Sequence, residues 1–275
     1  MSEKTIAFIG GGNMARSLIG GLVADGHPPA ALRAAEPDAE RREALISDYG
    51  IQGFEDNATA VRGADAVILA VKPGELAGVA RQLGGQIRDQ QSLVISIAAG
   101  VRSPDIAEWL GGDVPVVRAM PNTPALIQTG ATALFANPSV GPEQRDLAET
   151  TLRAAGMVVW LPDETQMDAV TALSGSGPAY FFLTMEAMQA AAERLGLDSD
   201  TARLLTLETA LGAARMALEA SEEPALLRRR VTSPGGTTAA ALAELEGGDL
   251  AGLYERALRA AAGRAHELGD ELGAQ

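Results

Sequence analysis

The 275-residue sequence predicts an α/β domain with a doubly wound, mostly parallel sheet, followed by an all-α domain. Three observations lead to this prediction. A glycine-rich turn follows the first apolar strand, apolar runs then alternate with helical segments as far as Pro162, and no convincing strand occurs from Asp163 onward. We therefore place the domains at residues 1–162 and 163–275.

The glycine-rich turn lies between a predicted strand and a predicted helix. Residues 5–9 are apolar and β-branched enough for a buried strand, and Gly10, Gly12 and Ala15 then fit the dinucleotide-binding pattern G-x-G-x-x-G/A of a Rossmann-type domain. The first glycine permits a tight turn, the second lets a diphosphate approach the backbone, and the alanine lets the helix pack closely on its strand. The diphosphate would meet free amides at the start of the helix predicted at 13–25. The alternative is a purely structural glycine turn.

An acidic residue follows the second predicted strand, at 32–35. Glu36 stands where an acidic side chain commonly binds the adenine-ribose hydroxyls of NAD. Glu36 and Asp38 would oppose the extra phosphate of NADP, whereas Arg41 and Arg42 could offset that repulsion. The choice between NADPH and NADH therefore stays open. Glu36 could instead be a solvated acid at the end of a strand.

The remaining strands of the first domain end in turns of unusual composition. Strands are predicted at 66–71, 92–97, 114–117, 131–135 and 157–161, and helices at 38–49 and 142–155. Ligands of parallel sheets gather at the carboxyl ends of strands, and the turns at 72–73, 98–100 and 120–124 all fall there. The small residues of the second turn leave room for a flat cofactor ring. Taken alone, each turn could be no more than a connection.

The second predicted domain contains a helix, at 201–220, whose apolar side chains cover nearly its whole circumference. Further helices are predicted at 167–173, 179–195, 239–246 and 250–272. A helix that is apolar all round must be buried, and a half-chain of this size has few neighbours to bury it. We expect a second subunit to cover it by two-fold pairing. The alternative is a helix at the centre of its own bundle.

A second candidate anion site follows the three arginines at 228–230. Gly235 and Gly236 free backbone amides, and Thr237 and Thr238 add hydroxyls at the start of the next helix. This arrangement suits a carboxylate. The alternative is a plain helix N-cap, which would need only one threonine.

The composition excludes several classes of function. The absence of cysteine excludes disulfides, thiolate metal sites and a cysteine nucleophile, and we expect no metal. The formal net charge of −14 argues against binding to nucleic acid or to anionic membranes. No apolar run is long enough for a bilayer, and the N-terminal residues lack the features of a secretion signal. We therefore expect a cytoplasmic protein.

The small number of lysines and histidines limits the reactions that the protein could catalyse. Lysine occurs only at Lys4 and Lys72, and histidine only at His27 and His266. An alcohol-oxidising nicotinamide enzyme needs a base, so a β-hydroxy-acid dehydrogenase is poorly supplied. Reduction of a carbon–nitrogen double bond demands less, because the imine nitrogen arrives protonated and positioning suffices. A nucleotide-binding regulatory protein without turnover is a third possibility.

Seven segments resemble the 1-pyrroline-5-carboxylate reductase family, in the family's order and over nearly the whole chain. They are residues 8–15, 70–73, 96–100, 118–124, 168–171, 173–180 and 231–238. The resemblance implies reduction of 1-pyrroline-5-carboxylate to L-proline with NADPH or NADH, the last step of proline biosynthesis. It also implies a helical homodimer, often assembled further into a ring of dimers, a decamer.

The resemblance also implies the residues of the site. Together with Glu36, the cofactor contacts fall on Gly10, Gly12, Asn13, Met14, Ala15, Asn57, Ala70, Val71, Lys72, Pro73, Ala98 and Ala99. The substrate carboxylate would meet Ser233, Gly235, Gly236, Thr237 and Thr238. Thr238 is the candidate to hydrogen-bond the imine nitrogen or the carboxylate, and Ser176 is expected to face the ring. Many NADPH-preferring relatives carry small hydroxyl residues where this chain has Glu36, so the resemblance leaves the choice between NADPH and NADH open.

Overall fold

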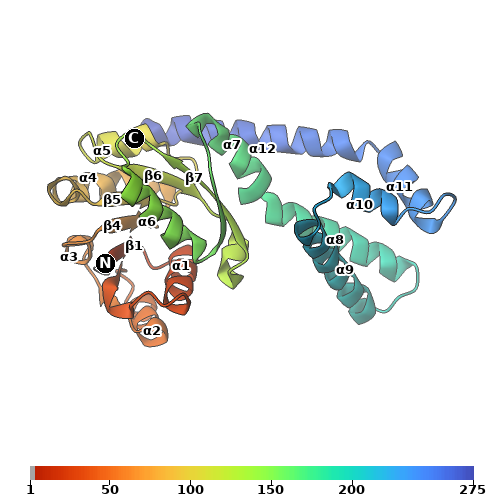
Figure 1. Cartoon of the computed structure of the whole chain (residues 1–275), viewed down its shortest axis with the longest axis horizontal. Coiled ribbons are helices and arrows are strands. Elements are labelled where there is room, and N and C mark those ends of the chain that lie inside the picture. Colours follow the sequence, from red (N-terminus) through yellow and green to blue (C-terminus); the bar gives the residue numbers. More distant parts are fainter. Residues whose placement is uncertain (1–3) are drawn as a thin grey trace. The chain divides into compact units, whose positions relative to one another are not determined.

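The computed structural model describes residues 4–275, which form two compact units (Figure 1). The first unit comprises the chain up to Ser176 together with Ala260–Gln275, and the second comprises Gly177–Arg259. The predicted domain boundary after Pro162 falls earlier in the sequence than the end of the first unit. The residues between these two points are helical turns that belong to the first unit by their contacts.

Within residues 4–275, eight strands form one sheet in the first unit. They are β1 (Ile6–Ile9), β2 (Leu32–Ala35), β3 (Gln52–Phe54), β4 (Ala66–Leu69), β5 (Leu93–Ser96), β6 (Val116–Met120), β7 (Gly130–Ala136) and β8 (Gly156–Trp160). Their order is β3-β2-β1-β4-β5-β6-β7-β8, and only the β6–β7 pair is antiparallel. The doubly wound, mostly parallel sheet is confirmed. The antiparallel pair and strand β3 were not predicted.

Helices cover both faces of this sheet. Successive strand residues point to opposite faces, and the apolar side chains of each face pack against helices. The helices are α1 (Asn13–Ala24), α2 (Ala39–Tyr49), α3 (Asn57–Val61), α4 (Pro73–Gln90), α5 (Ser103–Trp109) and α6 (Pro142–Arg153). Phe8 belongs to the core shared with α1, α2 and α6, whereas Ile9 belongs to the core shared with α3, α4 and α5. Both side chains are fully buried. Each contributes about 1.5–3 kcal/mol to stability.

Short helical turns complete the first unit. They are η1 (Pro29–Ala31), η2 (Thr123–Ile127), η3 (Glu164–Gln166), α7 (Met167–Val170) and the π-helical η4 (Thr171–Gly175). Glu164 fastens η3 to the sheet, because its carboxylate lies 3.1 Å from the buried Arg118 guanidinium of β6 and accepts hydrogen bonds from the Ser103 N–H and hydroxyl. These contacts of the half-buried Glu164 hold the segment that leads to Ser176.

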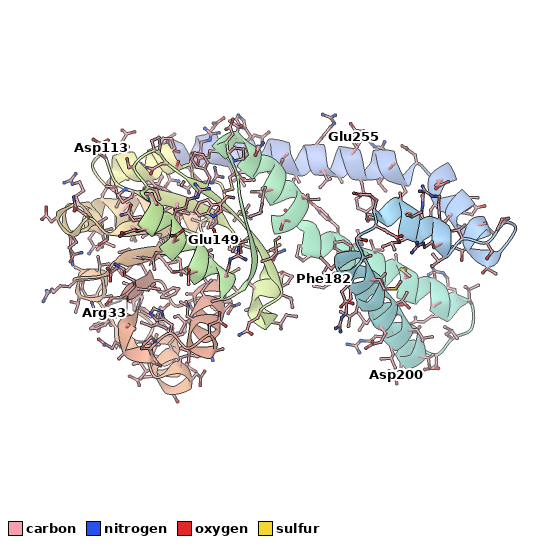
Figure 2. All side chains as sticks on the ribbon, viewed as in Figure 1. Arg33, Asp113, Glu149, Phe182, Asp200 and Glu255 are labelled. Carbon is pink, nitrogen blue, oxygen red and sulfur yellow. The ribbon has the colours of Figure 1, made fainter. Side chains whose placement is uncertain are left out.

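The second unit consists of helices alone, and few of its side chains are buried. It contains α8 (Gly177–Arg194), α9 (Ser199–Glu219), α10 (Pro224–Arg230), α11 (Thr237–Gly247) and α12 (Leu250–Gly273) as far as Arg259. Among its residues, all of which the structure describes, only Gly177, Ala202 and Thr206 are buried. Leu211 of α9 is 62% exposed. Phe182 of α8, which Figure 2 labels, is 64% exposed. The alternative in which α9 is the centre of a bundle from its own chain is therefore wrong.

Two further properties concern all of the described residues. None of the helices within residues 4–275 combines the length and the apolar character needed to cross a membrane. In the same range, no three or more His, Asp or Glu side chains lie together in a way that could hold a metal ion.

Candidate active site

The turn after β1 can form only with glycine at position 10, and it leaves open space beside Gly12. Gly10 has a φ of +98°, and a Cβ there would lie 2.8 Å from the Ala70 carbonyl oxygen. Gly12 has ordinary extended backbone, and a Cβ there would meet nothing within 4 Å. Ala15 is fully buried against the sheet. The three positions therefore do locally what the fingerprint requires: a tight turn, an open approach and close helix packing.

A cleft of about 530 Å³ opens beside this turn, at the carboxyl ends of β1, β2, β3 and β4. Its walls are formed by Gly10, Gly11, Gly12, Ala35, Glu36, Pro37, Arg41, Glu55, Asp56, Asn57, Ala70, Val71, Lys72, Glu75, Val79 and Gln82. The structure thus brings seven predicted cofactor residues together in one cleft, namely Gly10, Gly12, Glu36, Asn57, Ala70, Val71 and Lys72.

A second hollow, of about 620 Å³, shares Gly11, Gly12 and Arg41 with this cleft and adds Asn13. Asn13 is the first residue of α1, whose first turn carries no acidic side chain and no side-chain cap. The free amides of such a helix end favour an anion. The open space at Gly12 adjoins them, so the residues present fit a dinucleotide diphosphate. Met14, the next residue of α1, packs against the core instead.

Glu36 is held by backbone groups at the edge of the cleft. Its side chain accepts the Gly11 N–H at Oε2 (2.9 Å) and the Asp38 N–H at Oε1 (3.0 Å), and the residue is only 6% exposed. The alternative of a solvated strand-end acid is therefore wrong. The nearby Arg42 guanidinium donates to the Glu36 carbonyl oxygen at 2.6 Å rather than to the carboxylate. Within residues 4–275 the Glu36 carboxylate forms no ion pair, so its negative charge stays available to the cleft.

Two helix starts supply the far wall of the cleft. Asp56 caps α3 by accepting hydrogen bonds from the Thr59 hydroxyl (2.6 Å) and N–H (2.7 Å), which hold the pKa of Asp56 below its usual value. Asn57 follows as the first residue of that helix. Lys72 and Pro73 begin α4, and the Lys72 side chain forms no ion pair with any residue from 4 to 275.

The turn after β5 lies at the same edge of the sheet. Ala98 is 4% exposed, Ala99 is exposed, and Gly100 has a φ of +84°. The two alanines stand at the carboxyl end of a strand as predicted, but neither lines the cleft described above. Their contact with a cofactor ring therefore stays a prediction.

Ser176 ends a π-helical turn in the first unit. Its N–H donates to the Thr171 carbonyl oxygen at 2.8 Å. The side chain of Asn122, in the loop after β6, donates to the Ser174 carbonyl oxygen at 3.2 Å. Ser176 thus shares its unit with the cleft, and sequence reasoning did not foresee the hydrogen bonds that hold its segment.

The loop before α11 is shaped by Gly235, which has a φ of +72°. The Gly236 N–H donates to the Ser233 carbonyl oxygen at 3.0 Å, so this amide is already engaged within the loop. Gly236 is also the N-cap of α11, and no side chain caps that helix. The choice between a carboxylate site and a plain helix start therefore stays a prediction. Thr237 and Thr238 occupy the first turn, where amides have no intrahelical partner.

The histidines do not lie in the cleft. His266 is exposed, and its Nδ1 lies 3.1 Å from the Asp168 carboxylate. His27 has a buried Nε2 with no hydrogen-bond partner among the described residues. Neither therefore stands beside the glycine turn as a general base.

A further hollow, of about 960 Å³, lies at the opposite edge of the sheet. Gln91 and Pro115 in its walls precede β5 and β6, and Arg88 lies there beside Asp113 and Glu143. Its charges are mixed in sign, and it holds none of the predicted site residues. The smaller cleft at the glycine turn is chemically the better site.

An open glycine turn, a free helix start and a fixed acid beside one cleft define a dinucleotide-binding protein of the Rossmann type. Residues 5–100 match the family described as NADP oxidoreductase, coenzyme F420-dependent, and residues 164–268 match pyrroline-5-carboxylate reductase dimerisation. The chain is 52% identical over 273 residues to a pyrroline-5-carboxylate reductase of Pseudomonas aeruginosa, covering 99% of this chain and 100% of that one. It belongs to the pyrroline-5-carboxylate reductase family.

Solved structures agree with this assignment. A pyrroline-5-carboxylate reductase from Coxiella burnetii superposes with a TM-score of 0.94 at 48% identity, covering 97% of this chain and 99% of that chain. The pyrroline carboxylate reductase of Plasmodium falciparum, solved with NADP bound, gives a TM-score of 0.86 at 26% identity, covering 98% and 99%.

Proposed function

We propose that the chain reduces 1-pyrroline-5-carboxylate to L-proline with NADPH or NADH, as its family name describes. The observation that carries this proposal is the cleft that joins seven predicted cofactor residues beside the open face of Gly12. Membership of the family, at 52% identity over the whole chain, gives the substrate. A β-hydroxy-acid dehydrogenase is disfavoured because no histidine lines the cleft and its one lysine, Lys72, belongs to the predicted cofactor set.

The dinucleotide, when bound, supplies a hydride. The amides of Gly12, Asn13, Met14 and Ala15 would hold its diphosphate, because they form the uncapped first turn of α1. Glu36 would accept hydrogen bonds from the adenine ribose. The remaining cofactor residues of the proposal are Asn57, Ala70, Val71, Lys72, Pro73, Ala98 and Ala99.

The substrate carboxylate is assigned to the loop before α11. Ser233, Gly235, Gly236, Thr237 and Thr238 surround the start of a helix whose dipole favours an anion. Since the Gly236 N–H is already bonded to Ser233, the first-turn amides and the two threonine hydroxyls are the available donors. Thr238 hydrogen-bonds the imine nitrogen or the carboxylate, and Ser176 faces the ring. Catalysis on an imine that is already protonated rests on alignment, which requires no titrating side chain.

The family also supports an assembly of identical subunits. We assign nucleotide binding to residues 1–162 and subunit pairing to residues 163–275. The paired state is a homodimer, and a decamer of five dimers is its further assembly. The exposed apolar side chains of α9 support this assignment, because a partner would cover them. We place the enzyme in the cytoplasm, where biosynthetic reductases draw on NAD(P)H.

The test is the oxidation of NADPH and NADH by purified protein with 1-pyrroline-5-carboxylate. Thr238→Ala should raise the KM for the imine about tenfold, the order expected for one lost hydrogen bond to a charged group, and leave the KM for the dinucleotide unchanged. Thr232→Ala is the matched control, because the Thr232 hydroxyl already donates a hydrogen bond to the Arg228 carbonyl oxygen. Wild-type protein without turnover on this imine would overturn the proposal. Retained NAD(P)H binding in that case would favour a regulatory protein.

Glu36→Gln tests the cofactor assignment. A carboxylate about 5 Å from a phosphate at an effective dielectric near 20 costs about 3 kcal/mol per pair of charges. The neutral amide should therefore raise the kcat/KM ratio of NADPH to NADH by about tenfold or more, with water screening part of the effect. An unchanged ratio would remove Glu36 from the ribose site.

A further inference from the structure

The side chain of Asn122 joins the end of β6 to the segment that ends at Ser176. Its Nδ2 donates to the Ser174 carbonyl oxygen at 3.2 Å and to the Ser174 hydroxyl at 3.4 Å. Its Oδ1 accepts the Ala131 N–H, at the start of β7, at 2.9 Å. One half-buried amide therefore uses both of its ends to hold three parts of the first unit together.

The segment that Asn122 holds has an unusual backbone. Thr171–Gly175 is π-helical, and the Ser176 N–H closes its last turn on the Thr171 carbonyl oxygen at 2.8 Å. Isolated π-helical turns are rare, so contacts from outside the turn must stabilise this one. Met120, the last residue of β6, supplies a second contact, because its side chain fills the space where a Cβ on Gly175 would lie. Met120 at the end of β6 and Asn122 just after it thus both contact the turn that ends at Ser176.

We infer that Asn122 is a positioning residue of the reaction: through Ser174 it sets the place of Ser176 beside the substrate ring. This inference rests on the proposed function, in which the reaction depends on alignment rather than on a titrating group. β6 belongs to the sheet whose strand ends form the nucleotide cleft, so Asn122 ties the substrate-facing turn to the framework that carries the cofactor residues. Loss of this tie should slow turnover without weakening dinucleotide binding.

The chain contains a matched control at the other end of the same strand pair. Asn137 follows β7, donates from Nδ2 to the Val114 carbonyl oxygen at 2.9 Å and accepts the Val116 N–H at 3.1 Å. Like Asn122, it is half-buried and bridges β6 and β7. It lies at the amino-terminal end of β6, away from Ser176 and the cleft. Replacing either asparagine by aspartate keeps the acceptor for the β-strand N–H and removes the donor.

The experiment compares N122D with N137D in the full-length protein. N122D should lower kcat about 10- to 100-fold, since small misplacements of reacting groups cost this much, and should change the KM for NAD(P)H less than twofold. The primary isotope effect on kcat with 4-deuterated NAD(P)H should rise only in N122D, because alignment then limits the rate. N137D should retain the wild-type kcat. Equal kcat values in the two variants, or a loss of dinucleotide binding in N122D that matches its loss of kcat, would overturn the inference.

Amide hydrogen exchange separates this inference from the proposed function. Residues 171–176 should exchange at least tenfold faster in N122D than in wild type, and at the wild-type rate in N137D. Equal protection in both variants would overturn the inference even if the wild-type enzyme is fully active. Faster exchange in N122D alone would show that Asn122 holds residues 171–176 in place, even if the wild-type protein fails to reduce the imine. If N122D does not fold, N122A is judged by the same measurements.

Discussion

The two units of this chain treat their apolar residues in opposite ways. In the first unit the sheet is covered on both faces, and side chains such as Phe8 and Ile68 are fully buried. In the second unit Leu211 is 62% exposed and Leu218 is 87% exposed. Both units are rich in apolar residues, so composition does not separate them. The difference lies in the source of the covering surface: a sheet of the same chain in one case, and another subunit in the other.

The largest expected effect comes from a charge on the apolar surface of the second unit. Leu211→Glu should abolish assembly and with it most activity, because a partner would have to bury an unpaired carboxylate. Light scattering and the imine-reduction assay measure the two consequences. Glu208→Lys is the control, since it changes the charge of the same helix at a polar position. A Leu211→Glu protein with the wild-type mass would show that this face is not covered by another subunit.

Paired phenylalanine truncations sharpen the contrast between the units. Phe8→Ala should cost about 3–5 kcal/mol of unfolding free energy, the usual effect of emptying a core site. Phe182→Ala, on a side chain 64% exposed within its own chain, should instead weaken assembly and leave the first unit stable. Both tryptophans, Trp109 and Trp160, belong to the first unit, so their fluorescence in urea follows that unit. Equal shifts of this transition in both variants would contradict the contrast.

Two glycine substitutions test separately the folding of the turn after β1 and its binding of the dinucleotide. Gly12→Val should fold normally and weaken NAD(P)H binding about 100-fold, because its side chain would occupy open space at the diphosphate site. Gly10→Val should fold poorly, since its φ of +98° and the nearby Ala70 carbonyl oxygen exclude a side chain. Titration calorimetry and circular dichroism measure these outcomes. Tight binding by Gly12→Val would place the diphosphate elsewhere.

The smallest effect is expected at Asp105, in α5 of the first unit. Burial raises the pKa of Asp105, although the nearby Arg102 acts in the opposite direction, and its Oδ2 is buried without a hydrogen-bond partner among residues 4–275. A carboxyl whose pKa is raised on folding destabilises the folded state above that pKa, and the penalty vanishes below its ordinary pKa of about 4. Asp105→Asn should therefore raise the melting temperature more at pH 7 than at about pH 3, one unit below the ordinary pKa. A gain of equal size at both pH values would exclude burial of the ionised carboxylate as the cause.

Local features of the sequence were sufficient to predict the nucleotide-binding turn. The roles of Gly10, Gly12 and Ala15 follow from backbone geometry within one strand–turn–helix unit, and the structure shows that geometry. Glu36 was placed correctly at the end of β2, but its hydrogen bond to the Gly11 N–H joins residues from two different turns. No pattern along the chain indicates such a tertiary contact.

The errors share a physical cause. Strand β3 has only three residues and lacks an apolar alternation, so its pairing with β2 alone makes it a strand. The hydrogen bond from Asn122 to Ser174 joins residues that are 52 positions apart, and the composition of the proline-rich loop around Asn122 does not indicate it. The apolar circumference of α9 did predict that its own chain would leave it uncovered, because that property is intrinsic to one helix.

Helix α12 returns the chain to the first unit. Leu272 packs against the core that α3, α4 and α5 share with the sheet, and the Arg81 guanidinium donates to the Gln275 carbonyl oxygen at 2.9 Å. During synthesis, the ribosome therefore makes the whole helical unit before residues 260–275 can close this core. The exposed leucines of α9 emerge while the nucleotide-binding unit is still incomplete, so a newly made chain passes through a stage in which both units await their final contacts.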